Sequence, residues 1–114
     1  MFFYHALYVS DRIRDPRRIR KRLARNMRCP GIYIIAADPE GGSAGKAFIL
    51  DAAYLRSGWY KEHPPYIIGL ALGREDAMEL TGRILLEALE ETGRADITGY
   101  LFPHGIRVTG EAER

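Results

Sequence analysis

Residues 66–93 constrain the fold more than any other part of the chain. Tyr66–Leu72 is apolar at every position, which is typical of a β-strand that is covered on both faces. Gly73 then turns the chain, and apolar side chains recur at helical spacing from residue 77 to residue 88. Gly93 provides a typical helix stop, because glycine adopts the left-handed conformation at low cost. The stretch therefore predicts a buried strand, a tight turn and a long helix.

The predicted helix has more apolar side chains than one packing face requires. Met78, Leu86 and Leu89 form a second stripe beside Gly82, where the missing side chain permits another element to approach closely. Exposed apolar patches of this kind usually mark an interface. Together with strands that are apolar on both faces, the stripe predicts a homodimer, formed through an open sheet face or through this side of the helix.

Length and composition place the chain among single-domain globular proteins. It has 114 residues, of which 46% are hydrophobic and 28% are charged, and both values are ordinary for a soluble globular protein. We expect one domain over residues 1–103 and a flexible tail over residues 104–114. A single cysteine, no leader-like segment and no apolar run of membrane length predict a cytoplasmic protein without a membrane partner.

The positive charge is concentrated in one segment. Residues 11–28 hold nine basic and two acidic side chains, a local net charge of 9 − 2 = +7, whereas the rest of the chain carries 8 − 13 = −5. Asp15 and Pro16 predict the start of a helix, which continues with an apolar residue at every fourth position. This narrow apolar seam consists of Ile19, Leu23 and Met27. The candidate polyanion-binding residues on the outward face are Arg17, Arg18, Lys21, Arg22 and Arg25.

Two interpretations of this basic helix are open. Its outward face binds a polyanion, such as nucleic acid or an acidic protein, or acidic residues elsewhere neutralise it. The neutralising residues belong to a partner or to the second helix, where the acidic side chains are Glu79, Glu87, Glu90 and Glu91. No aromatic residue interrupts the basic helix, so we expect any nucleic-acid binding to be weak and to use phosphates.

The other segments complete an α+β fold. Phe2–Val9 and residues 31–37, 46–51 and 96–102 have the composition of strands, and residues 52–60 that of a short helix. Without the insert at residues 39–64, the element order is β-α-β followed by β-α-β. This order predicts a ferredoxin-like, two-layer sandwich with both long helices on one face of the sheet. The alternative is a small three-layer α/β arrangement.

The residues that carry chemistry do not form a recognisable catalytic or metal-binding motif. The three histidines are His5, His63 and His104. They lie on separate predicted elements without paired-ligand spacing, and Cys29 has no assignable histidine partner. The glycine-rich loop at residues 38–46 lacks two defining residues of a phosphate-binding loop, so we interpret it as a hairpin connection. We therefore predict no metal, no cofactor and no catalytic residue.

Aromatic residues are concentrated near the end of the insert. Such a cluster usually caps a small core, and the alternative is a ligand pocket or a partner surface. The candidate residues are Tyr54, Trp59, Tyr60, His63 and Tyr66. The sequence does not identify a small-molecule ligand for them.

Four short segments stand out in the second half of the chain: Pro65-Tyr-Ile-Ile-Gly-Leu-Ala-Leu, Arg74-Glu-Asp-Ala, Glu90-Glu-Thr-Gly and Asp96-Ile-Thr-Gly-Tyr-Leu. In these segments the chain resembles a set of short bacterial proteins of unknown function. The resemblance implies a shared small α/β fold and assigns no site residue.

Three functional classes follow from the sequence. The first is a non-catalytic, homo-oligomeric module for interaction or ligand sensing. The second is a nucleic-acid-binding protein that uses the basic helix, and the third is an enzyme without a recognisable motif. We prefer the first class, because it makes the fewest demands on particular residues.

Overall fold

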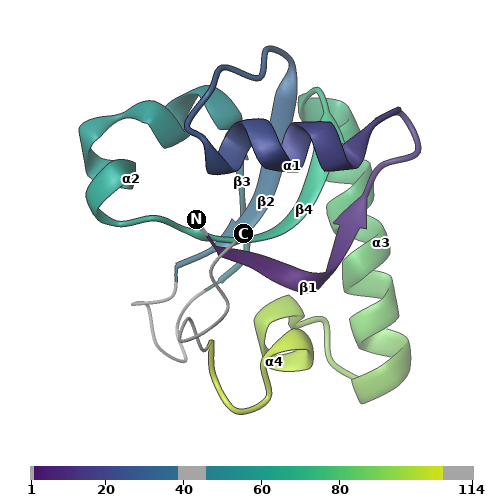
Figure 1. The fold of residues 1–114 in the computed structure, drawn as a ribbon. Helices are drawn as coiled ribbons and strands as arrows, with labels where there is room; N and C mark the ends of the chain where they lie inside the picture. Colours follow the sequence, from purple (N-terminus) through teal and green to yellow (C-terminus); the bar gives the residue numbers. More distant parts are fainter. Residues whose placement is uncertain (1, 39–45, 107–114) are drawn as a thin grey trace.

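The computed structural model describes residues 2–38 and 46–106, which form a four-stranded sheet with helices on both faces (Figure 1). The strands are β1 (Phe2–Val9), β2 (Ile32–Ala37), β3 (Phe48–Asp51) and β4 (Tyr66–Leu72). The helices are α1 (Pro16–Ala24), the 3-10 helix η2 (Ala52–Arg56), α2 (Gly58–Glu62), α3 (Arg74–Thr92) and α4 (Ile97–Leu101). The α+β class that the sequence predicts is confirmed.

The predicted central strand, β4, lies inside the sheet. β1 pairs with it in parallel, β2 pairs with it antiparallel, and β3 extends the sheet beyond β2. Residues 66–71 are all buried, which explains why the strand is apolar without alternation. A Cβ atom on Gly69 would lie 3.2 Å from the backbone oxygen of Tyr8 and 3.3 Å from a methyl group of Ile35. Glycine at this position therefore lets the neighbouring groups pack closely.

Two separate cores lie on opposite faces of the sheet. Along β2, Ile34 and Ala36 belong to the first core and Ile35 and Ala37 to the second, because successive side chains of a strand alternate. Residues of α1 and η2 complete the first core, and residues of α3 and α4 complete the second. The prediction that both long helices pack on one face is therefore wrong. The alternative, a small three-layer arrangement, describes the structure, since strands that are apolar on both faces need cover on both.

The ferredoxin-like order is not confirmed. In a split β-α-β unit the two strands that flank the middle strand run parallel to each other, whereas β1 and β2 flank β4 in opposite directions. The prediction of a last strand at residues 96–102 is wrong, because residues 97–101 form the helix α4. The Asp96 carboxylate caps this helix by accepting a hydrogen bond from the Gly99 amide, and Ile97 is buried in the second core.

The inserted segment follows its sequence pattern where the structure describes it. β3 pairs antiparallel with β2, and the predicted short helix is present as two pieces, η2 and α2. Asp51 caps η2 and Ser57 caps α2. Residues 39–45 of the expected hairpin connection and residues 107–114 of the expected tail lie outside the described residues.

Candidate polyanion-binding surface

Helix α1 is fixed at its start and along one apolar side. The Asp15 carboxylate accepts a hydrogen bond from the Arg18 amide at 3.1 Å, and Pro16 occupies the start of the helix, as the sequence predicts. Leu23 is buried in the first core, and Ile19 is half-buried against it. The apolar side chains of α1 are therefore used by the fold, and its other sides face solvent.

The helix ends earlier than its apolar pattern predicts. Asn26 takes a left-handed conformation with a φ of 56°, and the Met27 amide turns back to donate to the Arg22 carbonyl at 2.9 Å. Met27 is 42% exposed as a result. The prediction that Met27 continues the apolar seam is wrong, and its side chain lies beside the basic residues instead.

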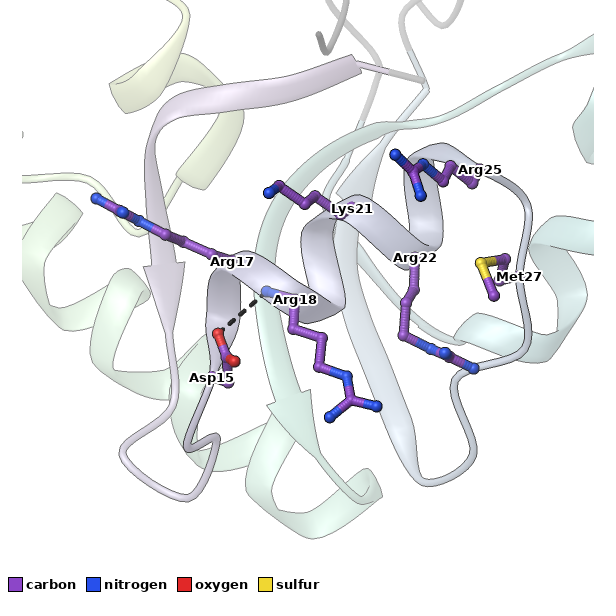
Figure 2. Close-up of a pocket in the computed structure, with 7 residues that line it drawn as sticks. All are labelled: Asp15, Arg17, Arg18, Lys21, Arg22, Arg25 and Met27. Atoms are coloured by element: carbon purple, nitrogen blue, oxygen red, sulfur yellow. Dashed lines mark hydrogen bonds between the residues drawn. The ribbon is translucent and has the colours of Figure 1, made fainter.

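A shallow hollow of about 380 Å³ lies on the outer side of α1 and brings together all five candidate basic residues (Figure 2). These residues are Arg17, Arg18, Lys21, Arg22 and Arg25. Arg22 is half-buried and the other four are exposed. Figure 2 shows that the side chains spread along and around the helix and do not converge on one point. This arrangement suits an extended chain of anionic groups better than a single small anion.

The acidic side chains of α3 do not neutralise this surface. α3 packs on the opposite face of the sheet from α1, so the four acidic residues named above lie in the other layer. One of them, Glu87, accepts hydrogen bonds from the hydroxyl groups of Tyr8 at 2.5 Å and Tyr100 at 2.8 Å. Neutralisation of the five basic residues of α1 by these four glutamates of the same chain, which the sequence left open, is therefore excluded by the layering.

Few basic side chains of residues 12–28 have a partner among the described residues. Arg12 approaches Asp76 with 3.8 Å between Nε and Oδ1, and the Arg22 guanidinium donates to the Arg28 carbonyl at 2.7 Å. Four candidates form no ion pair or side-chain hydrogen bond with a described residue: Arg17, Arg18, Lys21 and Arg25. Their charges are therefore available to a partner.

A second hollow, of about 490 Å³, adjoins the same helix. Its floor is apolar and includes Ile13, Ile32 and Leu72, and its rim carries arginines from residues 12–22. Cys29 borders it too, but this residue is buried and its thiol donates to the Met27 carbonyl at 3.7 Å. The basic surface therefore continues beside an apolar floor at the end of β4.

The structure separates the five residues of the predicted aromatic cluster. Tyr66 is buried on the side of the second core, opposite Ala37 in the β2–β4 ladder. Tyr54 and Trp59 are exposed, and Tyr60 is half-buried. His63 stacks on Trp59 with the ring centroids 3.8 Å apart. Residues 54–63 therefore present exposed rings, and Tyr66 belongs to the interior.

Two residues that adjoin the basic surface were not among the predicted candidates. Arg28 and Arg56 line a cleft of about 200 Å³ between the loop that follows α1 and η2. Arg28 belongs to the basic run, so its charge is a signal that the sequence contains. Arg56 lies far along the chain in the insert, and no spacing in the sequence connects it to α1.

A buried carboxylate, Asp76, lies in the first turn of α3. Burial raises its pKa, but hydrogen bonds from the Ser10 hydroxyl and the Leu72 amide act in the opposite direction. The charges of Arg12 and Arg83 add to these bonds, and the pKa of Asp76 is lowered overall. Asp76 joins the ends of β1 and β4 to α3, so we assign it a structural role.

A second hydrogen-bonded group joins β1 and α4 to α3. Burial and the hydrogen bond to Glu87 raise the pKa of Tyr8 well above its ordinary value. The hydrogen bond to Glu87 raises the pKa of Tyr100 to about 12. Both phenols therefore stay protonated at neutral pH and act as donors to the carboxylate.

Comparisons with known proteins identify no family for this chain. No protein-family model, no curated protein and no solved structure matches it. Among the described residues, no three histidine, cysteine, aspartate or glutamate side chains are grouped so that they could hold a metal ion. Within residues 2–38 and 46–106, no helix is long and apolar enough to cross a membrane.

Proposed function

We propose that the protein is a non-catalytic binding module whose α1 surface takes nucleic acid through its phosphates. The uncompensated charge of α1 carries this proposal. Four exposed basic side chains have no acidic partner among the described residues, and the acidic helix α3 lies behind the sheet. Such a group of cations binds phosphates with release of counterions, and the binding requires no further chemistry.

The arrangement of α1 also carries a cost in stability that a bound polyanion offsets. The pairs 17/21, 18/22 and 21/25 place like charges one helical turn apart, at about 0.2–0.5 kcal/mol for each pair. Arg17 and Arg18 lie in the first turn, where the helix dipole disfavours positive charge. Phosphate groups beside these residues reduce both penalties.

The buried side of α1 argues against a membrane surface as the partner. An interfacial helix inserts its apolar side chains between lipids. In α1 those side chains, Ile19 and Leu23, pack against the first core. α1 therefore offers charge without a free apolar side, which suits the phosphates of nucleic acid.

Two matched triple variants test the proposal. Arg18→Gln, Lys21→Gln and Arg25→Gln remove three charges from α1 and spare Arg22, whose guanidinium donates to the Arg28 carbonyl. The control removes three charges from exposed arginines on or beside α3: Arg74→Gln, Arg83→Gln and Arg94→Gln. Both variants change the net charge of the protein equally, so a difference between them reports the position of the charge.

We expect the α1 variant to bind labelled oligonucleotides at least about tenfold more weakly than the wild type and the control at physiological salt. Fluorescence anisotropy with single-stranded and duplex oligonucleotides measures this. The slope of log affinity against log salt should become shallower, by about 0.7 per lost contact for a single strand and about 0.9 for a duplex. Circular dichroism checks that both variants are folded.

Three results would contradict the proposal. One is equal affinity of the wild type and the α1 variant for both oligonucleotides. Another is an equal loss of affinity in the α3 control, which would mean that net charge alone decides. The third is tighter binding to polyglutamate or to anionic lipid vesicles than to nucleic acid, which would assign the surface to an acidic protein or to a membrane.

A further inference from the structure

The segment that follows β3 lies on the same face of the sheet as α1. η2 buries Ala52 and Leu55 in the core that Leu23 of α1 also enters. In Figure 1 the end of α1 that leads to β2 points toward the helical segment formed by η2 and α2. η2 therefore lies on the same face of the sheet as α1 and on the opposite face from α3.

The cleft of about 200 Å³ connects the two regions. Its walls are the loop at residues 28–31 on one side and Asp51, Ala53 and Arg56 on the other. Asp51 is the acidic residue in these walls, and its carboxylate accepts a hydrogen bond from the Ala53 amide at 2.9 Å. Arg28 and Arg56 are both exposed, so positive charge continues from α1 across the cleft to η2.

The segment formed by η2 and α2 presents two large aromatic side chains to solvent. Trp59 is 63% exposed and Tyr54 is 60% exposed, although burial of such rings is favourable. His63 packs almost flat against the Trp59 indole, with 19° between the ring planes. The Nδ1 atom of His63 also lies 3.1 Å from the Trp59 carbonyl oxygen. The indole is therefore supported on one face while most of its surface stays open.

We infer that the partner is a single-stranded nucleic acid whose backbone follows α1 and crosses the cleft, while its bases stack on Trp59 and Tyr54. This inference rests on the proposed function. Proteins that bind single strands combine a positively charged groove with aromatic side chains on which successive bases stack. A duplex keeps its bases paired and stacked on each other, so it offers α1 its phosphates but offers Trp59 no free base.

The sequence predicts phosphate binding alone, because no aromatic residue lies within the basic helix. The structure brings η2, which carries Tyr54 and leads into the helix of Trp59, to the same face of the sheet as α1. This placement depends on the packing of η2 through Ala52 and Leu55, which the sequence pattern does not specify.

The fluorescence of Trp59 provides a direct test, because it is the only tryptophan in the chain. A single-stranded oligonucleotide of about 16 nucleotides, the upper end of common site sizes, should quench this fluorescence on binding. A duplex of the same length and inorganic polyphosphate should bind α1 and leave the fluorescence nearly unchanged. Polyphosphate is the matched control, since it has the phosphates without the bases.

Three substitutions separate stacking from charge. Trp59→Ala should weaken single-strand binding about tenfold, whereas Trp59→Phe, which keeps a ring for stacking, should retain most of the affinity. Tyr54→Ala should cause a smaller loss than Trp59→Ala, because its ring is smaller. Affinity for polyphosphate, measured by competition, should be the same in all three variants and in the wild type.

The outcomes distinguish the inference from the proposed function. If the α1 variant loses single-strand binding but Trp59→Ala binds as the wild type does, the single-strand inference is wrong and the proposed function stands. Equal quenching by the duplex would also contradict the inference. If the α1 variant binds every probe as tightly as the wild type, both fail together. Quenching by the single strand alone, with loss in Trp59→Ala and retention in Trp59→Phe, supports both.

Discussion

The two faces of the sheet bury similar cores beneath very different surfaces. On one face, the nine-residue α1 buries a single apolar side and exposes charge. On the other, the 19-residue α3 buries one side and exposes a second, apolar stripe. Residues 74–94 carry 3 − 6 = −3, against +7 for residues 11–28. Apart from the contact between Arg12 and Asp76, the fold thus places the basic residues of α1 and the acidic residues of α3 on opposite sides of the sheet.

The substitutions with the largest expected effect test whether each face of the sheet has a hydrophobic core. Leu23→Ala under α1 and Ile84→Ala under α3 should each lower the free energy of unfolding by about 2–5 kcal/mol, because both side chains are buried. An exposed side chain provides the control, and Tyr54→Ala should change the free energy by less than about 0.5 kcal/mol. Urea unfolding measures all three. If Leu23→Ala lowers the free energy of unfolding as little as Tyr54→Ala does, α1 covers no core. The two faces of the sheet would then not be comparable.

A smaller effect is expected at the contact that joins the two faces. Asp76 of α3 accepts a hydrogen bond from the Leu72 amide at 2.8 Å and lies beside Arg12, in the segment that leads to α1. Asp76→Asn should lower the free energy of unfolding at neutral pH by about 1–3 kcal/mol, because a charged acceptor is lost from a buried site.

The effect of Asp76 should depend on pH in a defined direction. The pKa of Asp76 is lowered from 3.8 by folding, so its carboxylate stabilises the folded state above that unfolded-state value. This contribution is lost as the pH falls through the folded-state pKa. The difference in unfolding free energy between the wild type and Asp76→Asn should therefore shrink from neutral pH to about pH 2. A difference that stays constant over this range would show that the charge of Asp76 does not stabilise the fold.

Local features of this fold are readable from the sequence because nearby residues determine them. Asp15 and Pro16 start α1, the apolar run of β4 is buried, and Gly93 ends α3 with a φ of 76°. The placement of the helices on the two faces of the sheet, in contrast, is not determined by nearby residues. Because each central strand is apolar on both faces, periodicity does not show which face a helix covers, and only the structure places α1 on one face and α3 on the other.

The wrongly predicted elements have local causes, unlike the wrongly predicted layering of the helices. Residues 96–102 are largely apolar and resemble an edge strand, but Asp96 supplies a helix cap and Ile97 an anchor in the core. Met27 fits the apolar spacing of α1, yet Asn26 ends the helix before it. In the candidate site, the basic residues were predictable because exposed charge follows from composition. The position of Arg56 was not, because it depends on how η2 packs.

The exposed stripe on α3 is the counterpart of the basic surface on α1. Met78, Leu86 and Leu89 are 56%, 55% and 45% exposed, which is unusual for large apolar side chains. Between them, a Cβ atom on Gly82 would meet nothing within 4 Å, so a second helix has room to cross there. The open sheet face, which the sequence offered as the other dimer surface, is absent from the described part of the fold because helices cover both sides.

We predict that two copies of the chain associate through this stripe. A substitution within the stripe should therefore change assembly far more than it changes the stability of the single chain. Light scattering at micromolar concentration should give twice the mass of the chain, and the melting temperature should rise with protein concentration. Leu86→Glu should give a monomer whose own unfolding free energy changes by less than about 0.5 kcal/mol, because the side chain is exposed. The α1 triple variant should remain a dimer, since its substitutions lie in the other layer. A monomeric wild type would contradict the prediction. The two faces of the sheet would then differ in charge, but the stripe on α3 would not bind a second copy of the chain.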